Sequence, residues 1–221
     1  MYTYAFLPIS NTLDLPEGIS GSLQLVTVDQ LAALVEPDLS LESLQTSDDV
    51  LMRAVLYHDQ VIREVFEQTP VLPLRFGTCF VSRQGLMEHL GTHRAEYLEK
   101  LEQLSGQAEY LLKLKPIPTP ENPISVNLKG REYFLAKKQH YQNQTEWQNR
   151  QQAELETLKL FITQHYPNVV QTETTEGIER IYLLSDRVNE AHLKEQAKEW
   201  QMRSSYWDVS LGGALPPYHF V

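Results

Sequence analysis

The sequence predicts an α+β protein of two domains, a mixed α/β domain over residues 1–106 and a ferredoxin-like βαββαβ domain over residues 107–221. Short apolar runs alternate with segments of helical periodicity, which is typical of mixed folds. Gly106 follows a helical segment and so indicates a boundary. Beyond it, the predicted elements follow the order of the split βαβ unit, with a long first helix.

Composition argues against several classes of function. The formal net charge is −10, and nucleic-acid binding depends mainly on lysine and arginine, so we expect no nucleic-acid partner. The chain contains no run of about 18 apolar residues, so we expect no membrane partner. The one cysteine, Cys79, rules out a disulfide framework within the chain and fits a reducing, cytoplasmic setting.

The first part of the chain contains two predicted strands and a short helix. Residues Tyr2–Leu7 and Leu23–Val28 are apolar runs of strand length, separated by a loop rich in serine, asparagine, glycine and proline. Asp29 can cap a short helix over Gln30–Val35, which predicts a third element there.

The clearest element is a helix predicted from Ser47 to about Gln68, with Thr46 as its cap. Its apolar residues recur every three or four positions, as in a helix with one buried face. His58 lies in this stripe and is therefore predicted to be a packed core histidine. The apolar members of the stripe are Val50, Leu51, Ala54, Val55, Val61, Ile62, Val65 and Phe66.

Residues 71–80 form a short apolar segment, which predicts one strand or two strands bent at Gly77. The apolar neighbours of Cys79 predict a buried thiol and not a nucleophile. Arg75 lies inside the segment, where a guanidinium needs polar partners. We expect it to have a structural role, to contact a partner or to be simply exposed. A helix over residues 82–105, capped by its first serine, follows.

In the second domain, strands and helices alternate around one long helical segment. The strands are predicted at 109–115, 168–174, 178–185 and 206–211, and the helices at 130–166 and 186–202, with a loop containing Pro123 before the first helix. At 1.5 Å per residue the first helix would be roughly 50 Å long, so we expect it to break or to project beyond the sheet. Trp147 in its middle is predicted to pack locally or, on a projecting helix, to contact a partner.

Reactive groups give only weak signals. The chain contains no Walker loop, GxGxxG fingerprint or GxSxG elbow. His89 and His93 are four residues apart on a predicted helix and can share a metal, but no third ligand is evident. We therefore predict no catalytic residue, no metal site and no cofactor, and we do not expect an enzyme.

A basic band interrupts the acidic chain between Lys113 and Lys138, where six basic residues face two acidic ones. Such a band can steer an acidic partner, and the alternative is a solvated face. We predict that Lys137 and Lys138 bind a partner, together with Arg75 and Trp147.

Four segments resemble the gas vesicle protein family that contains proteins F and L. Residues Val71–Thr78 are similar to its "PLRFGT" core, and Leu128–Lys138 resembles its "GREYL" stretch at the head of a long helix. Ile181–Leu184 resembles its late "YLV" strand. The ending Pro216–Val221 resembles its "GPWPPYSF" tail, although residues 213–215 are Gly-Ala-Leu where Gly-Pro-Trp is usual. In length the chain is closer to F members than to L members.

The resemblance implies a minor component or assembly accessory protein of the gas vesicle, located at the vesicle within the cytoplasm. Its implied partners are the small hydrophobic shell protein and other gas vesicle accessory proteins. Because an unassembled shell subunit has an apolar gas-facing side that would aggregate, we expect the chain to bind that side through an apolar patch or an exposed strand edge. The family has no known catalytic residue. The residues alone leave two alternatives, a small-ligand-binding regulatory module and a small enzyme on a ferredoxin-like scaffold, with a deep polar pocket near Arg75, His89 or Cys79.

Overall fold

The computed structural model describes residues 1–10, 12–120 and 129–221 and has the predicted α+β fold. It divides into two compact units, of which the first comprises Met1–Glu109, Asp186–Val188 and Ala214–Val221, and the second Tyr110–Ser185 and Asn189–Gly213. The last segment of the chain thus returns to the first unit. The boundary at residue 106 stays a prediction for independently folding domains. Pro123 and Leu128, singled out above, lie outside the described residues.

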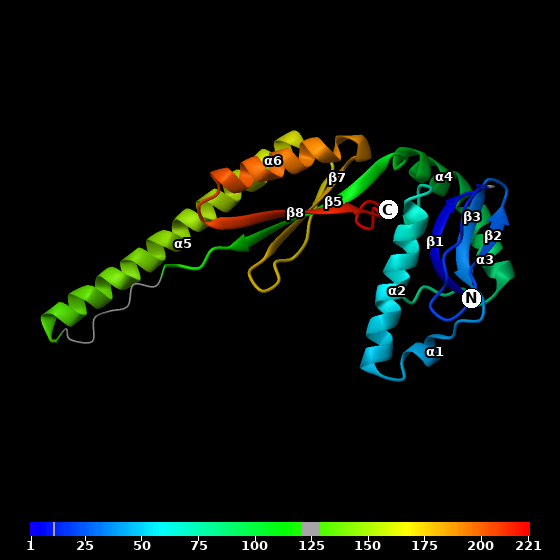
Figure 1. The fold of residues 1–221 in the computed structure, drawn as a ribbon, viewed down its shortest axis with the longest axis horizontal. Coiled ribbons are helices and arrows are strands. Elements are labelled where there is room, and N and C mark those ends of the chain that lie inside the picture. Colours follow the sequence, from blue (N-terminus) through cyan, green and yellow to red (C-terminus); the bar gives the residue numbers. More distant parts are fainter. Residues whose placement is uncertain (11, 121–128) are drawn as a thin grey trace. The chain divides into compact units, whose positions relative to one another are not determined.

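The first unit is built on a four-stranded sheet in the order β2-β3-β1-β4, with helices on both faces (Figure 1). Its elements are β1 (Tyr2–Pro8), β2 (Gln24–Val28), β3 (Leu31–Glu36), α1 (Leu41–Leu44), α2 (Asp48–Phe66), β4 (Leu72–Pro73), α3 (Arg83–Thr92) and α4 (Arg94–Gln103). The central strands β1 and β3 are buried along almost their whole length, because each face of the sheet is covered by helices.

A bulge in β1 directs its aromatic residues to both faces of the sheet. Thr3 pairs with Val35 and Ala5 pairs with Leu34, so Tyr4 is an extra residue in the strand. Tyr4 stacks on His58 of α2. Phe6 instead contacts Tyr97 of α4, with ring centroids 4.9 Å apart. Regular alternation would have placed the fourth and sixth residues on one face.

The helix predicted over Gln30–Val35 is wrong, because residues 31–36 form strand β3. Asp29 has a φ of 52° and lies in the tight turn that joins β2 to β3 in a hairpin. A short, continuous apolar run fits a strand covered on both faces as well as a buried helix. Pairing with β1 and β2 decides between the two.

Glu36 at the end of β3 is only 1% exposed, and its carboxylate is surrounded by hydrogen-bond donors. It accepts bonds from the backbone N–H groups of Ile19 (2.9 Å) and Ser20 (2.8 Å) and from the Tyr4 hydroxyl (2.5 Å). At Gly18 an added Cβ would lie 2.4 Å from this carboxylate, so the close approach requires glycine. The buried carboxylate therefore folds the loop after β1 onto the sheet.

Three helix ends differ from the expected ones. The hydroxyl of Ser47, and not that of Thr46, accepts the capping bond of α2. The single helix expected over residues 82–105 is divided at His93 into α3 and α4. Asp186 ends a strand and does not cap the next helix, which begins at Glu190 after a short 3-10 turn. Helix type and position were predictable here, whereas the boundaries depended on tertiary contacts.

The second unit has the predicted ferredoxin-like arrangement, with the sheet order β6-β7-β5-β8 and two helices on one face (Figure 1). In β5 the buried residues Tyr110, Leu112 and Leu114 alternate with half-buried Leu111 and the exposed Lys113 and Lys115, because one face of the sheet is covered by the helices. Its elements are β5 (Gln107–Pro116), α5 (Arg131–His165), β6 (Val169–Gln171), β7 (Glu179–Asp186), α6 (Glu190–Arg203) and β8 (Trp207–Leu215).

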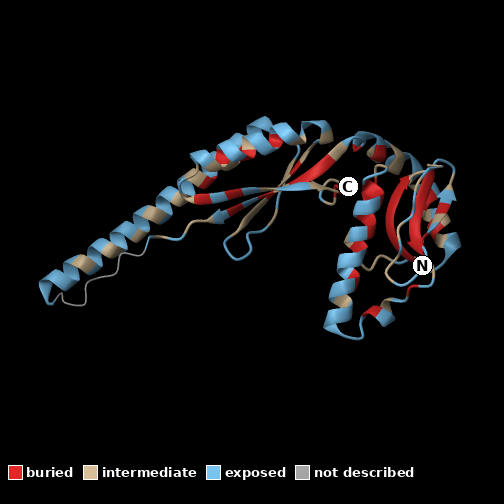
Figure 2. Cartoon of the chain, viewed as in Figure 1, coloured by how far each residue is buried: buried red, intermediate tan, exposed pale blue. Residues whose placement is uncertain are grey.

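Helix α5 is continuous over 35 residues, so the first helix of this unit projects beyond the sheet and does not break. Its buried residues, Leu155 and Ile162, both belong to the C-terminal half. Figure 2 shows the N-terminal half as largely exposed. None of the helices in the described part of the chain combines the length and the apolar character that a membrane crossing requires.

Replacing the buried carboxylate tests this account of the first unit. We expect Glu36→Ala to lower the free energy of unfolding by at least ~3 kcal/mol, because several buried donors lose a charged acceptor. Glu102→Ala on the exposed side of α4 is the control, with an expected change of less than ~0.5 kcal/mol. Urea unfolding followed by circular dichroism measures the free energy of unfolding of both variants. Equal losses in the two variants would contradict the stabilising role assigned to the Glu36 carboxylate.

Candidate partner-binding groove

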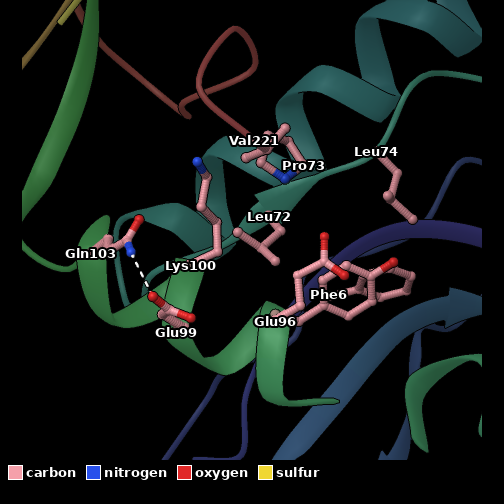
Figure 3. Close-up of a pocket in the computed structure, with 10 residues that line it drawn as sticks. Phe6, Leu72, Pro73, Leu74, Glu96, Glu99, Lys100, Gln103 and Val221 are labelled. Atoms are coloured by element: carbon pink, nitrogen blue, oxygen red, sulfur yellow. Dashed lines mark hydrogen bonds between the residues drawn. The ribbon is translucent and has the colours of Figure 1, made fainter. Parts of the chain in front are cut away.

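The first unit contains a largely apolar groove of about 450 Å³ between β4 and α4 (Figure 3). The wall on the side of the sheet consists of aliphatic and aromatic side chains. The charged and amide side chains that line the groove all belong to α4. Its lining consists of Phe6, Leu72, Pro73, Leu74, Tyr97 and Val221, with Glu96, Glu99, Lys100 and Gln103 along the helix. Gln103 donates a hydrogen bond to Glu99 (3.2 Å), so part of this polar rim is internally paired.

The segment that resembles the "PLRFGT" core forms one wall of this groove. Leu72 and Pro73 pair with Phe6 and Ala5 of β1 and so make β4 an edge strand. The segment pairs with β1 at two points on either side of a turn at Gly77, as in the predicted alternative of two bent pieces. After β4, Cys79 bridges Tyr2, and the Thr3 amide donates to the Thr78 carbonyl (2.9 Å). Since β4 has only two residues and one is proline, it offers little backbone for adding another strand. What the wall presents to a partner is apolar side chains.

A buried histidine fixes the end of this wall. His58 is 3% exposed, with Nε2 3.0 Å from the Leu74 carbonyl and Nδ1 2.8 Å from the Tyr2 hydroxyl. The carbonyl can only accept, so Nε2 carries a proton and donates it. The Tyr2 oxygen accepts from the Gly77 amide (3.3 Å) and can donate to Nδ1. The ring is thus fully bonded while neutral, which confirms the predicted core histidine.

The loop after the wall is held by backbone bonds and displays an arginine. Gly77 has a φ of +87°, a conformation that favours glycine, and the Thr78 hydroxyl donates to the Arg75 carbonyl (2.7 Å). The Arg75 side chain is exposed, and no carboxylate in the described residues lies within 4.0 Å of its guanidinium. The structural ion pair considered for Arg75 is therefore not present among those residues.

The predicted histidine pair supports the opposite wall. His89 and His93 have ring centroids 4.4 Å apart, and His89 Nε2 lies 2.8 Å from the hydroxyl of Tyr97. Burial, with a contribution from His93, lowers the pKa of His89. Within residues 1–10, 12–120 and 129–221, no three histidine, cysteine or acidic residues cluster as metal ligands. The pair thus orients Tyr97, which lines the groove.

The C-terminal tail closes one end of the groove, and sequence reasoning missed this role. The backbone amide of His219 donates to Glu109 (2.8 Å), and His219 Nδ1 lies 2.8 Å from the same carboxylate, which is 1% exposed. Burial raises the pKa of Glu109, and the bonds from His219 oppose this. Val221 then reaches the groove. The "PPYSF" resemblance was the only signal in the sequence.

The other predicted site residues lie elsewhere. Cys79 is exposed, so the expected buried thiol is wrong: its backbone bridges Tyr2 of β1, but its side chain stays open to solvent. Lys137 and Lys138 are exposed on α5 of the second unit. Trp147 of that helix packs locally, with its indole N–H donating to the Ile117 carbonyl (3.3 Å). Partner contact by these side chains stays a prediction.

Comparison with known proteins places these features in a family. The family described as gas vesicle synthesis protein GvpL/GvpF matches residues 1–221. The crystal structure of the gas vesicle protein GvpF from Anabaena sp. PCC7120 has a TM-score of 0.71 at 17% identity, covering 99% of this chain and 94% of that one. GvpF from Microcystis aeruginosa gives a TM-score of 0.69 at 18% identity, covering 99% and 97%. No curated protein matches the chain.

The His58 network predicts a pH-dependent stability. Burial lowers the pKa of folded His58 below its ordinary value of 6.5, so as pH falls the unfolded chain takes up the proton first. This contribution to stability is complete above ~pH 6.5 and is lost as pH falls towards the folded pKa. We expect His58→Leu to cost about 2–4 kcal/mol near pH 7.5, because Tyr2 and the Leu74 carbonyl lose their partner.

The cost of His58→Leu should shrink near ~pH 5, where the wild-type chain has itself lost this stabilisation. Urea unfolding at both pH values measures the difference, and His192→Gln on the exposed side of α6 serves as the control. A cost that is unchanged or larger at the lower pH would contradict the neutral assignment of His58.

Proposed function

Since the chain belongs to the gas vesicle synthesis protein family GvpL/GvpF, we propose that it is an assembly accessory protein that binds the small hydrophobic shell protein. It contacts that subunit at its gas-facing side, works with other accessory proteins and becomes a minor component of the vesicle within the cytoplasm. The observation that carries this proposal is that the segment resembling the family's "PLRFGT" core forms the apolar wall of a groove.

The groove has the chemistry that an apolar partner needs. A subunit with an apolar face aggregates when that face meets water, so a binding protein must offer it hydrocarbon. Leu72, Pro73 and Leu74 supply such a surface on one side, and Phe6 and Tyr97 supply it between the sheet and α4. A space of about 450 Å³ is large enough for a few side chains, which favours a short segment of the subunit.

Side-chain insertion is a better mode of binding here than strand addition. Adding a strand requires a row of free backbone donors and acceptors at a sheet edge. The edge strand β4 consists of Leu72 and Pro73, and proline has no N–H to donate. The groove wall can therefore gain affinity from buried apolar area, at roughly 25 cal/mol for each Å².

Arg75 and the net charge complete the proposal. Arg75 directly follows the groove wall, and its exposed guanidinium can pair with a carboxylate of the bound subunit. The net charge of −10 keeps the protein and its cargo dispersed by electrostatic repulsion. We propose that the groove binds a partner and does not catalyse a reaction. Its polar residues lie along one helix and do not converge on a reaction centre.

A charge introduced into the groove should weaken binding of the shell protein. We expect Leu74→Asp to weaken binding at least ~30-fold, because a carboxylate would be desolvated against apolar groups. Val81→Asp is the matched control, since Val81 is fully exposed and does not line the groove. Titration calorimetry of the full chain with purified shell protein measures both affinities.

Equal weakening by the two variants, or no association of the wild-type chain with the shell protein, would contradict the proposal. In cells, the Leu74→Asp chain should leave few intact vesicles, whereas the Val81→Asp chain should support normal numbers. Immunogold labelling of intact and collapsed vesicles then tests whether the protein is retained and whether its epitopes lie on the gas-facing side.

A further inference from the structure

The exposed half of α5 carries aromatic and basic side chains along one side. We call Phe134, Lys137, Lys138 and Tyr141 the aromatic–basic stripe. Phe134 is 71% exposed and Tyr141 is 56% exposed, although aromatic rings of this size are usually at least half covered. The four residues line one shallow depression, which continues along the polar residues Gln142, Thr145, Glu146 and Asn149.

The stripe lies beside, and not on, the side of α5 that packs within its own unit. Its members are spaced three and four residues apart, so they share one face of the helix. The packed side is marked by Trp147 and Gln151, which both donate to the carbonyl of Ile117. At 100° per residue the centre of the stripe lies about 110° around the helix from these two positions. In the part of the chain that the structure describes, the stripe is therefore left exposed.

The stripe is positive in a negative chain. Residues 129–141 contain four basic residues and Glu132, a local charge of +3 by count, whereas the whole chain carries −10. In the described part of the chain, no carboxylate lies within 4.0 Å of Lys137 or Lys138. Lys137 Nζ lies 5.9 Å from the centre of the Tyr141 ring, so the aromatic and basic groups form one surface.

We propose that the aromatic–basic stripe docks an amphipathic helix of another protein that carries acidic residues beside its apolar face. The repeat of three and four residues matches the ridges of a second helix laid along α5. Phe134 and Tyr141 pack against its apolar side chains, and Lys137 and Lys138 pair with its carboxylates. This surface is separate from the apolar groove and does not depend on the function proposed for the groove.

Other occupants fit less well. If two copies of the chain paired through this stripe, lysines would face lysines and repel. A bilayer surface requires a continuous apolar face, whereas the same side of α5 continues into Gln142, Thr145 and Asn149. These amide and hydroxyl groups can instead hydrogen-bond to side chains of a protein helix.

The test uses the full chain and two synthetic helical peptides of about 21 residues, or three heptads. Both carry leucines on one face, flanked by glutamates in one peptide and by lysines in the other. We expect the acidic peptide to bind at least ~10-fold more tightly than the basic one, and to weaken as salt is raised. Titration calorimetry gives the affinities.

Two variants connect binding to the stripe. Lys137→Glu/Lys138→Glu should reduce affinity for the acidic peptide at least ~10-fold, and Phe134→Gln/Tyr141→Gln should reduce it similarly through lost apolar contact. Lys198→Glu/Arg203→Glu on exposed α6 changes the charge equally and should leave affinity unchanged. Circular dichroism verifies that each variant keeps its helix content.

Equal affinity for both peptides, unaffected binding by the stripe variants, or equal loss in the α6 control would each overturn the proposal. Two further results would also overturn it. In both, the stripe variants still bind the peptide, but they lose either self-association of the chain or binding to anionic phosphatidylserine vesicles. Loss of shell-protein binding through Leu74→Asp has no bearing on this outcome, because that residue belongs to the groove.

Discussion

The hydrogen bonds of neutral His58 to Tyr2 and to the Leu74 carbonyl are the constraint on which the proposed groove depends. A buried ring nitrogen and a buried hydroxyl are costly unless each finds a partner, so this network has essentially one arrangement. That arrangement fixes the backbone at Leu74. The apolar wall therefore ends there, and the next residue, Arg75, is exposed. The bulge at Tyr4 completes it by turning Phe6 to the other face, where Phe6 becomes part of the groove lining.

The structure of the second unit also follows from which of its surfaces are buried. Its sheet is covered on one face only, and two helices are enough for that. The C-terminal half of α5 contributes Leu155 and Ile162 to the core of this unit. The N-terminal half of the helix contributes no fully buried residue. Apart from Trp147, the large side chains there are mostly exposed, so they can combine positive charge with aromatic character. The two proposed surfaces therefore use different chemistry, apolar burial in one unit and charge with aromatic contact in the other.

Much of this fold could be predicted from local patterns. The helical repeat around His58, the βαββαβ order of the second unit and the long helical segment of α5 are all visible in the chain, because they depend on spacing of three, four or two residues. Sequence reasoning failed at Gln30–Val35, since a short apolar run has no period that separates a strand from a buried helix. It failed again at Cys79, because the bridge to Tyr2, a distant residue, sets the position of Cys79 and leaves its thiol exposed.

By itself, the sequence determined the fold class, the family and the core role of His58, because each follows from residues close together along the chain. Only the tertiary structure decided that residues 72–74 face α4 across a groove, that Tyr97 is oriented by His89, and that the tail returns through His219 to Glu109. Those contacts join residues that are distant in sequence, and no local preference encodes which distant partners meet. They form because the buried polar groups and apolar faces of the first unit must each be satisfied at once, a condition that exists only in the folded chain.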